Sequence, residues 1–165
     1  LLYCGLNKAK IDTEVRKIMT SQQVPHSRYF TTPTPLNNWL WYVVAAADSG
    51  FYIGYRSVFD KKDSIRFHYV AQQQSLLKPL AGQEDLHNLL RFSNGYYSVE
   101  QRNDTLLYND IRFGEQIGWR STGTPFVFYY YLEHPGANKL VVQRGRFAGW
   151  DRNAFRSLLT RIRGE

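Results

Sequence analysis

Aromatic side chains in alternating runs constrain this chain more than any other sequence feature. Phe, Trp and Tyr make up 16% of its 165 residues, and most stand where apolar and polar side chains alternate. Such residues fit a half-buried pleated surface better than a helix. The pattern therefore predicts a mainly antiparallel, strongly aromatic sheet. With 43% hydrophobic and 21% charged residues, the composition is that of a globular protein, and a single domain over residues 1–165 is expected.

Pairs of alternating runs separated by short turns predict β-hairpins. Residues 39–47 and 51–59 flank Asp48-Ser49-Gly50, a turn whose glycine is free to adopt a positive φ. A third run, residues 65–71, extends this meander. The remaining runs are residues 96–101 with 106–113, and residues 126–133 with 140–143. The expected sheet has about seven strands.

Three segments carry apolar residues at helical spacing. They are residues 7–23, the shorter segment 83–92, and residues 153–163, which are amphipathic and follow Asp151 as a candidate N-cap. Prolines between residues 25 and 35 predict an extended connector. The expected layout is an N-terminal helical part (1–24), this connector (25–35), and a sheet with two helices (36–165). The predicted fold class is α+β.

The first residues indicate a longer protein. The sequence starts Leu-Leu-Tyr-Cys-Gly-Leu without an initiator methionine, so we expect the chain to be a piece of something larger. Residues 1–6 are then either a frayed terminus or the last apolar residues of a membrane helix. No segment reaches the roughly 20 apolar residues of a membrane span, which predicts a soluble domain. Cys4 is the only cysteine, so an intrachain disulfide is excluded.

The motifs of common enzymes are absent from the sequence. It contains no phosphate-binding loop, dinucleotide fingerprint, Gly-x-Ser-x-Gly elbow or His-Glu-x-x-His pair. Four histidines stand on separate predicted elements, without the spacing of metal ligands: His26, His68, His87 and His134. No catalytic residue, metal or other cofactor is therefore expected in this part of the protein.

The segment Asn-Asp-Ile-Arg-Phe-Gly at residues 109–114 is the best candidate for a ligand or partner surface. In a strand, Asp110 and Arg112 face one side while Ile111 and Phe113 face the other. The charged pair either grips a ligand or forms a salt bridge on the solvated face, contributing about 0 to 1 kcal/mol. A hydrolase-type pocket, in which Asp110, Arg112 and a histidine serve as acid, base and anion anchor, is the enzymatic alternative.

Three further residues are candidates for the same surface: Trp41, Arg56 and His68. Trp41 belongs to a strand with apolar residues on both faces, which indicates either core packing or a platform for an aromatic ligand. Arg56, on the first predicted hairpin, is a candidate neighbour of the charged pair.

The last 22 residues form a basic end, with six arginines against two acidic residues, in a chain of net charge +7. The arginines are Arg144, Arg146, Arg152, Arg156, Arg161 and Arg163. Such a cluster is either a solvated helix face or a site for anionic lipid headgroups or nucleic acid.

The order of several segments resembles that of a known family. These segments are an N-terminal helix, Thr-Pro-Thr-Pro-Leu-Asn-Asn-Trp-Leu-Trp-Tyr (32–42), Gly-Tyr-Tyr-Ser-Val (95–99), Asn-Asp-Ile-Arg-Phe-Gly (109–114) and an arginine-rich terminal helix. Together they resemble the C-terminal soluble region of the bacterial membrane-bound metal-dependent hydrolases, the YbcI/YdjM-like family of the inner membrane. The histidine-rich motifs of that family lie among its transmembrane helices and match no position here.

The resemblance implies an accessory domain held at the bilayer surface. A divalent metal would belong to the membrane portion that precedes this region, and no metal ligand or catalytic residue carries over. The implied partners are that membrane portion and the membrane surface, with nucleic acid disfavoured. The implied location is the bacterial inner membrane. The resemblance leaves the side of the membrane open, and the basic residues favour the cytoplasmic side. The leading expectation is a non-catalytic domain that serves substrate access or partner interaction.

Overall fold

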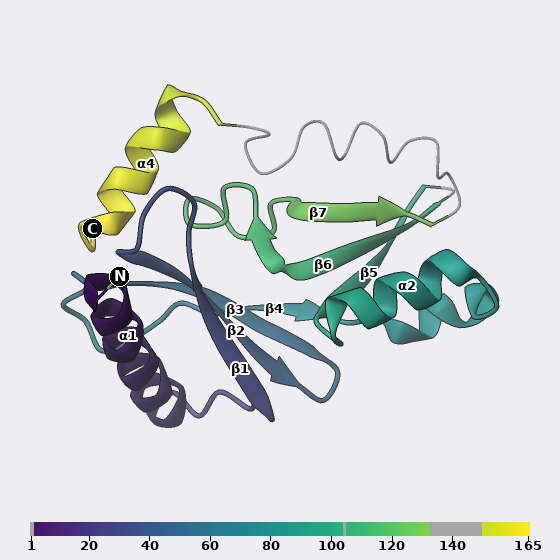
Figure 1. Cartoon of the computed structure of the whole chain (residues 1–165), viewed down its shortest axis with the longest axis horizontal. Coiled ribbons are helices and arrows are strands. Elements are labelled where there is room, and N and C mark those ends of the chain that lie inside the picture. The colour runs from purple at the N-terminus through teal and green to yellow at the C-terminus, as the bar shows by residue number, and fades with distance from the viewer. Residues whose placement is uncertain (1, 104, 133–149) are drawn as a thin grey trace. The chain divides into compact units, whose positions relative to one another are not determined.

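The chain folds as two compact α+β units. The computed structural model describes residues 2–103, 105–132 and 150–165 (Figure 1). Unit 1 comprises Leu1–Val70, Trp119–Thr122 and Asp151–Glu165, and unit 2 comprises Ala71–Gly118 and Gly123–Trp150. The predicted α+β class with antiparallel strands is confirmed. The expectation of one domain over the whole chain stays a prediction.

Unit 1 contains a four-stranded sheet in the order β1-β2-β3-β4. Its strands are β1 (Arg28–Pro33), β2 (Leu40–Ala47), β3 (Gly50–Ser57) and β4 (His68–Ala71). The first predicted hairpin is confirmed, because β2 and β3 pair antiparallel from Leu40↔Ser57 to Ala47↔Gly50 around a turn of two residues. The third predicted run forms only the short strand β4.

The segment between residues 25 and 35 is extended, as predicted, but it contains strand β1 and is not only a connector. Arg28 pairs with Ala46 and Pro33 with Trp41 along the edge of the sheet. A residue that precedes a proline is biased towards extended backbone, and an edge strand tolerates a proline that lacks an N–H donor. The prolines therefore delimit an edge strand here.

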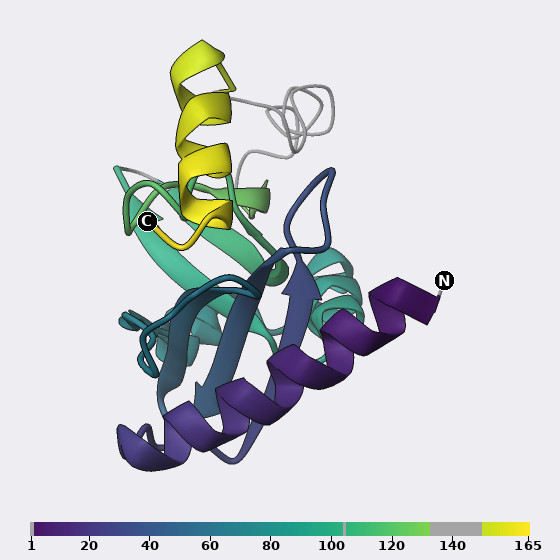
Figure 2. The ribbon, with the colours of Figure 1, turned by 90° about the vertical axis from the view of Figure 1, so that its left-hand side faces the viewer.

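Helix α1 (Leu2–Ser21) covers one face of the unit 1 sheet, as Figure 2 shows. Its buried residues Ile11, Val15 and Ile18 pack with Trp41 and Val43 of β2 in one hydrophobic cluster. The helix predicted over residues 7–23 is confirmed, although it begins earlier and ends at Ser21. None of the described helices combines the length and the apolar composition that a membrane span requires.

Helix α4 (Arg152–Ile162) contacts the C-terminal end of β3 in unit 1. The side chain of Asp151 accepts a hydrogen bond from the Ala154 amide at 2.6 Å, which confirms the predicted N-cap. The Arg161 guanidinium donates to both carboxylate oxygens of Asp60 at 2.6 and 3.0 Å, just beyond β3. The helix ends before Gly164, whose φ of +83° suits a glycine.

Unit 2 contains a three-stranded antiparallel sheet in the order β5-β6-β7. Its elements are β5 (Tyr97–Arg102), β6 (Thr105–Glu115), β7 (Phe126–Tyr131), the 3-10 helix η1 (Gln74–Leu80) and α2 (Glu84–Ser93). The predicted middle helix and the hairpin after it are confirmed. The strand predicted at residues 140–143 lies outside the described residues. The seven described strands thus form two sheets, where the sequence predicts one.

Two stacked tyrosines lie in the core of unit 2. The rings of Tyr97 and Tyr108 are nearly parallel, with centroids 5.0 Å apart. The Tyr108 hydroxyl lies 2.6 Å from Ser93 Oγ and donates to the Leu89 carbonyl at 3.2 Å, so it ties the end of α2 to the sheet. Burial raises the pKa of both tyrosines above the ordinary value, because it disfavours the charged phenolate.

The free energy of unfolding is expected to fall as pH rises above about 10, the ordinary tyrosine pKa. There the unfolded tyrosines ionise while folded Tyr97 and Tyr108 keep their protons, so the unfolded state binds fewer protons. Each tyrosine lowers the free energy by up to about 1.4 kcal/mol per pH unit. Urea unfolding between about pH 9 and pH 11 measures this slope. Tyr108→Phe should show a shallower fall, and an unchanged slope would contradict the assignment.

Candidate functional site

Three phenylalanines from three elements of unit 2 form an aromatic cluster. Phe92 comes from α2, Phe113 from β6 and Phe128 from β7. The rings of Phe92 and Phe113 stack with centroids 6.2 Å apart, and Phe128 lies 6.0 and 5.5 Å from them. Phe92 is 53% exposed and Phe113 38% exposed. The cluster thus offers aromatic faces to a ligand.

Backbone geometry brings these rings together. Helix α2 ends after Phe92 because Asn94 adopts the left-handed conformation that terminates helices. On β6, the pairing register with β7 shifts between Asp110 and Glu115, and Gly114 takes a φ of +80°. Strict alternation places Phe113 on the face opposite Asp110. The register shift instead lets Phe113 pack against Phe128, which is the cross-strand partner of Asp110.

A buried ion pair holds an arginine beside this cluster. Arg112 Nε and Nη2 donate to the two carboxylate oxygens of Asp110 at 3.0 and 2.6 Å, and Asp110 is fully buried. The Arg112 guanidinium carbon lies 4.8 Å from the Phe92 ring centroid and 5.7 Å from that of Phe113. The hydrogen bond to Asp110 raises the pKa of Arg112 above its ordinary value. We call Arg112 and the three phenylalanines the aromatic–arginine site.

Burial of Asp110 corrects the expectation of a salt bridge on a solvated face. Asp110 lies opposite Tyr97 on one neighbouring strand and Phe128 on the other. The carboxylate is therefore covered by aromatic residues, while the side chain of Arg112 keeps 30% of its surface exposed. The pair is a buried anchor whose cationic end reaches solvent.

A groove of about 500 Å³ adjoins the aromatic–arginine site. It is formed by α2 and β7, and both apolar and polar side chains line it. Two of its lining residues are joined, because the Tyr130 hydroxyl donates to Asp85 Oδ2 at 3.3 Å. The lining residues are Asp85, Asn88, Leu89, Arg91, Phe92, Phe128 and Tyr130. The groove has a volume typical of small-ligand or side-chain pockets.

This geometry favours binding over acid–base chemistry. A general acid or base must come within hydrogen-bond reach of a substrate proton. Both oxygens of Asp110 instead accept from Arg112, and the carboxylate is buried. His87, on α2, is bonded to the Ala81 carbonyl, and His134 lies outside the described residues. The hydrolase-type alternative built on Asp110 and Arg112 gains no support from these contacts.

Trp41 and Arg56 lie in the interior of unit 1. For Trp41 this is the core-packing alternative, and neither residue lies on the expected ligand or partner surface. Trp41 packs under α1, and Arg56 is only 2% exposed. The Arg56 guanidinium is 2.9 Å from Glu14 and also donates to the Lys62 carbonyl. Both are therefore structural residues. His68, also in unit 1, lies half-buried on β4.

The six arginines of the basic C-terminal end differ in their surroundings. Arg144 and Arg146 lie outside the described residues. Arg161 is held by Asp60, whereas the remaining three arginines are exposed on or beside α4: Arg152, Arg156 and Arg163. Binding of anionic lipid or nucleic acid by this end stays a prediction.

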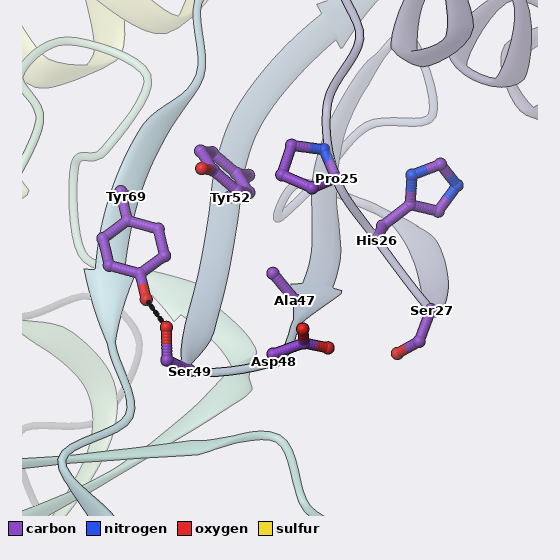
Figure 3. Close-up of a pocket in the computed structure, with 8 residues that line it drawn as sticks. All are labelled: Pro25, His26, Ser27, Ala47, Asp48, Ser49, Tyr52 and Tyr69. Carbon is purple, nitrogen blue, oxygen red and sulfur yellow. Dashed lines mark hydrogen bonds between the residues drawn. The ribbon is translucent and has the colours of Figure 1, made fainter.

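A second cavity, of about 460 Å³, lies in unit 1 beside the β2–β3 turn (Figure 3). Its walls come from the segment before β1, from the turn itself, and from β3 and β4. The lining residues are Pro25, His26, Ser27, Ala47, Asp48, Ser49, Tyr52 and Tyr69. Hydroxyl and carboxylate groups line this cavity together with the rings of Tyr52 and Tyr69, of which Tyr69 is exposed.

Comparison with protein-family models, curated protein sequences and solved structures finds no match to this chain. Within the described ranges, no group of three or more His, Cys, Asp or Glu side chains is arranged to hold a metal ion. The resemblance to membrane-bound metal-dependent hydrolases and the metal that it implies stay expectations.

Sequence reasoning missed Phe92 and Phe128 as members of the site. The position of Phe92 on its helix could have indicated its exposure. With 100° of rotation per residue, Phe92 lies about 110° around the helix from the centre of the apolar stripe Leu86, Leu89 and Leu90. An aromatic residue off the buried stripe of a helix indicates an exposed ring. Phe128 has no comparable signal, because every residue around it in β7 is apolar or aromatic.

Proposed function

We propose that this chain is a non-catalytic binding domain, and that its aromatic–arginine site holds a segment of a partner protein with an aromatic or large apolar residue beside an acidic one. The observation that carries the proposal is an exposed phenylalanine pair with a charged guanidinium fixed over it. Aromatic residues and arginine are enriched among the residues that dominate binding energy at protein interfaces.

The aromatic part of the site supports an apolar anchor on the partner. Covering a phenylalanine side chain contributes about 1.5 to 3 kcal/mol when it moves from water to an apolar contact. Phe92 stacks on Phe113 and also lines the groove, so a side chain packed against Phe92 would gain from the ring pair and from the groove wall. A single anchor residue would therefore gain binding energy from both the ring pair and the groove wall.

The charged part supports an acidic neighbour for that anchor. Asp110 occupies Nε and Nη2 of Arg112, which leaves its Nη1 group for a partner carboxylate. Because the guanidinium is already ordered, less side-chain entropy is lost on binding. Arg91 adds a second cation at the groove, where Asp85 already accepts from Tyr130, and the chain as a whole carries a net charge of +7. An acidic partner is therefore favoured.

This proposal develops the expectation of an accessory domain. The partner segment would belong to the membrane portion implied by the resemblance, or to another protein at the same membrane. Substrate access to a catalytic centre elsewhere would then depend on that contact. The fully engaged Asp110 supports the non-catalytic part of the proposal.

Selection from a random peptide display library against the purified chain tests the proposal. Enriched peptides are expected to share an aromatic or large apolar residue within a few positions of Asp or Glu. Phe92→Ser should reduce their binding at least tenfold, the equivalent of about 1.4 kcal/mol, because the central ring is lost. Affinity is measured by calorimetric titration with a synthetic peptide.

Phe59→Ser is the matched control, because Phe59 is a similarly exposed phenylalanine of unit 1. It should leave the affinity unchanged. Enrichment of basic peptides, or equal loss in the two variants, would contradict the proposal.

A further inference from the structure

We infer that the unit 1 cavity beside the β2–β3 turn binds a neutral pyranose sugar. Pyranoses present a face of C–H groups to aromatic rings and a rim of hydroxyls to polar groups, and the cavity combines both kinds of wall. The inference is independent of the proposed function, because every lining residue belongs to unit 1.

The apolar wall is formed by two tyrosines. The ring centroids of Tyr52 and Tyr69 are 5.1 Å apart with an angle of 56° between the ring planes. Figure 3 shows the two rings side by side above the turn, with Pro25 beyond Tyr52. Such contact makes one bent aromatic surface, suited to the C–H face of a sugar ring. It leaves no slot between the rings in which an organic cation could be enclosed.

Tyr69 is held in place before any ligand arrives. Its hydroxyl lies 2.7 Å from Ser49 Oγ. Gly50 allows this position, since a Cβ atom there would lie 2.6 Å from the Tyr69 hydroxyl oxygen and 2.3 Å from the Val70 carbonyl oxygen. A fixed ring loses little conformational entropy when a ligand stacks on it.

The polar wall offers acceptors for hydroxyl groups. The Asp48 carboxylate and the Ser27 hydroxyl line the cavity across from the tyrosines, as Figure 3 shows. His26 Nδ1 donates to the Val24 carbonyl at 2.8 Å, and Figure 3 shows the ring turned away from the two tyrosines, so the acceptors of this wall are Asp48 and Ser27. These groups match the donors that a sugar presents.

Charge and size narrow the ligand class further. The lining contains one carboxylate and neither lysine nor arginine, which disfavours phosphate and carboxylate ligands. The volume of about 460 Å³ lies near the lower end of the range for small-molecule sites. One neutral sugar ring of an oligosaccharide fits this description better than a nucleotide or a lipid.

The test is titration of the ¹⁵N-labelled chain with methyl glycosides of glucose, galactose and mannose and with N-acetylglucosamine. At least one sugar is expected to give saturable amide shifts at Ser27, Asp48 and Ser49. Tyr69→Ala should weaken its affinity about tenfold or more, and Asp48→Asn about tenfold, because a hydrogen bond to a charged group is lost. Tyr3→Ala, at an exposed tyrosine of α1, should leave the affinity unchanged.

Parallel titrations with tetramethylammonium and inorganic phosphate decide the ligand class. The inference is overturned if no sugar saturates these amides, or if only one of the two ions does. Asp48→Asn at an exposed turn keeps the test decisive should Tyr69→Ala fail to fold. A negative result here would not affect the proposed peptide binding by unit 2, because the two sites share no residue.

Discussion

Arg112→Met is expected to lower the free energy of unfolding by about 3 kcal/mol at neutral pH, because it leaves a buried carboxylate without its partner. Asp110 is fully buried, and both its oxygens accept from Arg112. Methionine keeps much of the side-chain volume, so the effect reports the charge. Urea unfolding followed by tryptophan fluorescence measures the difference.

Arg102→Met is the matched control in the same unit. The Arg102–Glu100 pair is exposed, with 50% and 39% of the two side chains accessible, so its loss should cost less than about 1 kcal/mol. The double variant Asp110→Asn with Arg112→Met should recover part of the stability, since it no longer buries a charge. Equal costs for Arg112→Met and Arg102→Met would contradict the buried anchor.

Asp60→Ala is expected to destabilise unit 1 by about 3 kcal/mol, because this carboxylate joins α4 to the end of β3. It accepts two hydrogen bonds from Arg161 and one from the Ser57 amide at 2.9 Å, and it lies 3.9 Å from the buried Arg56 guanidinium. Removing it leaves Arg161 without a carboxylate partner, while Arg56 keeps only Glu14. Hydrogen exchange of α4 amides should accelerate together with the loss of stability.

Asp63→Ala provides the comparison for this effect. Asp63 pairs with Lys17, and both side chains are at least 70% exposed, so the free energy of unfolding should change by less than about 1 kcal/mol. If the two alanine variants unfold at the same urea concentration, Asp60 does not hold α4 in place.

Local patterns predicted most elements, because their determinants lie close in sequence. The Asp48-Ser49-Gly50 turn specified the first hairpin, and apolar spacing specified α1 and α4. The edge strand β1 was missed because its partner β2 must first exist for Thr31 to face Val43. The division into two sheets was likewise not visible, since alternation indicates a strand but not its neighbours.

The candidate site was predictable only in part. The spacing of Asp110 and Arg112 indicated a pair on one face of a strand, but the burial of Asp110 depends on Tyr97 and Phe128 from other strands. Nothing in the local sequence distinguishes Arg56 from an exposed strand arginine. Its burial depends on α1, from which Glu14 pairs with it. Contacts between distant segments carry no signature in a single sequence.

The most direct test of a partner-binding function is to map a selected peptide on the ¹⁵N-labelled chain. Saturable amide shifts are expected on α2 near Phe92, on β6 around Arg112 and on β7 at Phe128. The Phe92→Ser variant should lose them, while Phe59→Ser keeps them. Shifts confined to residues outside these three elements, or binding that persists in Phe92→Ser, would contradict the aromatic–arginine site as the binding surface of this domain.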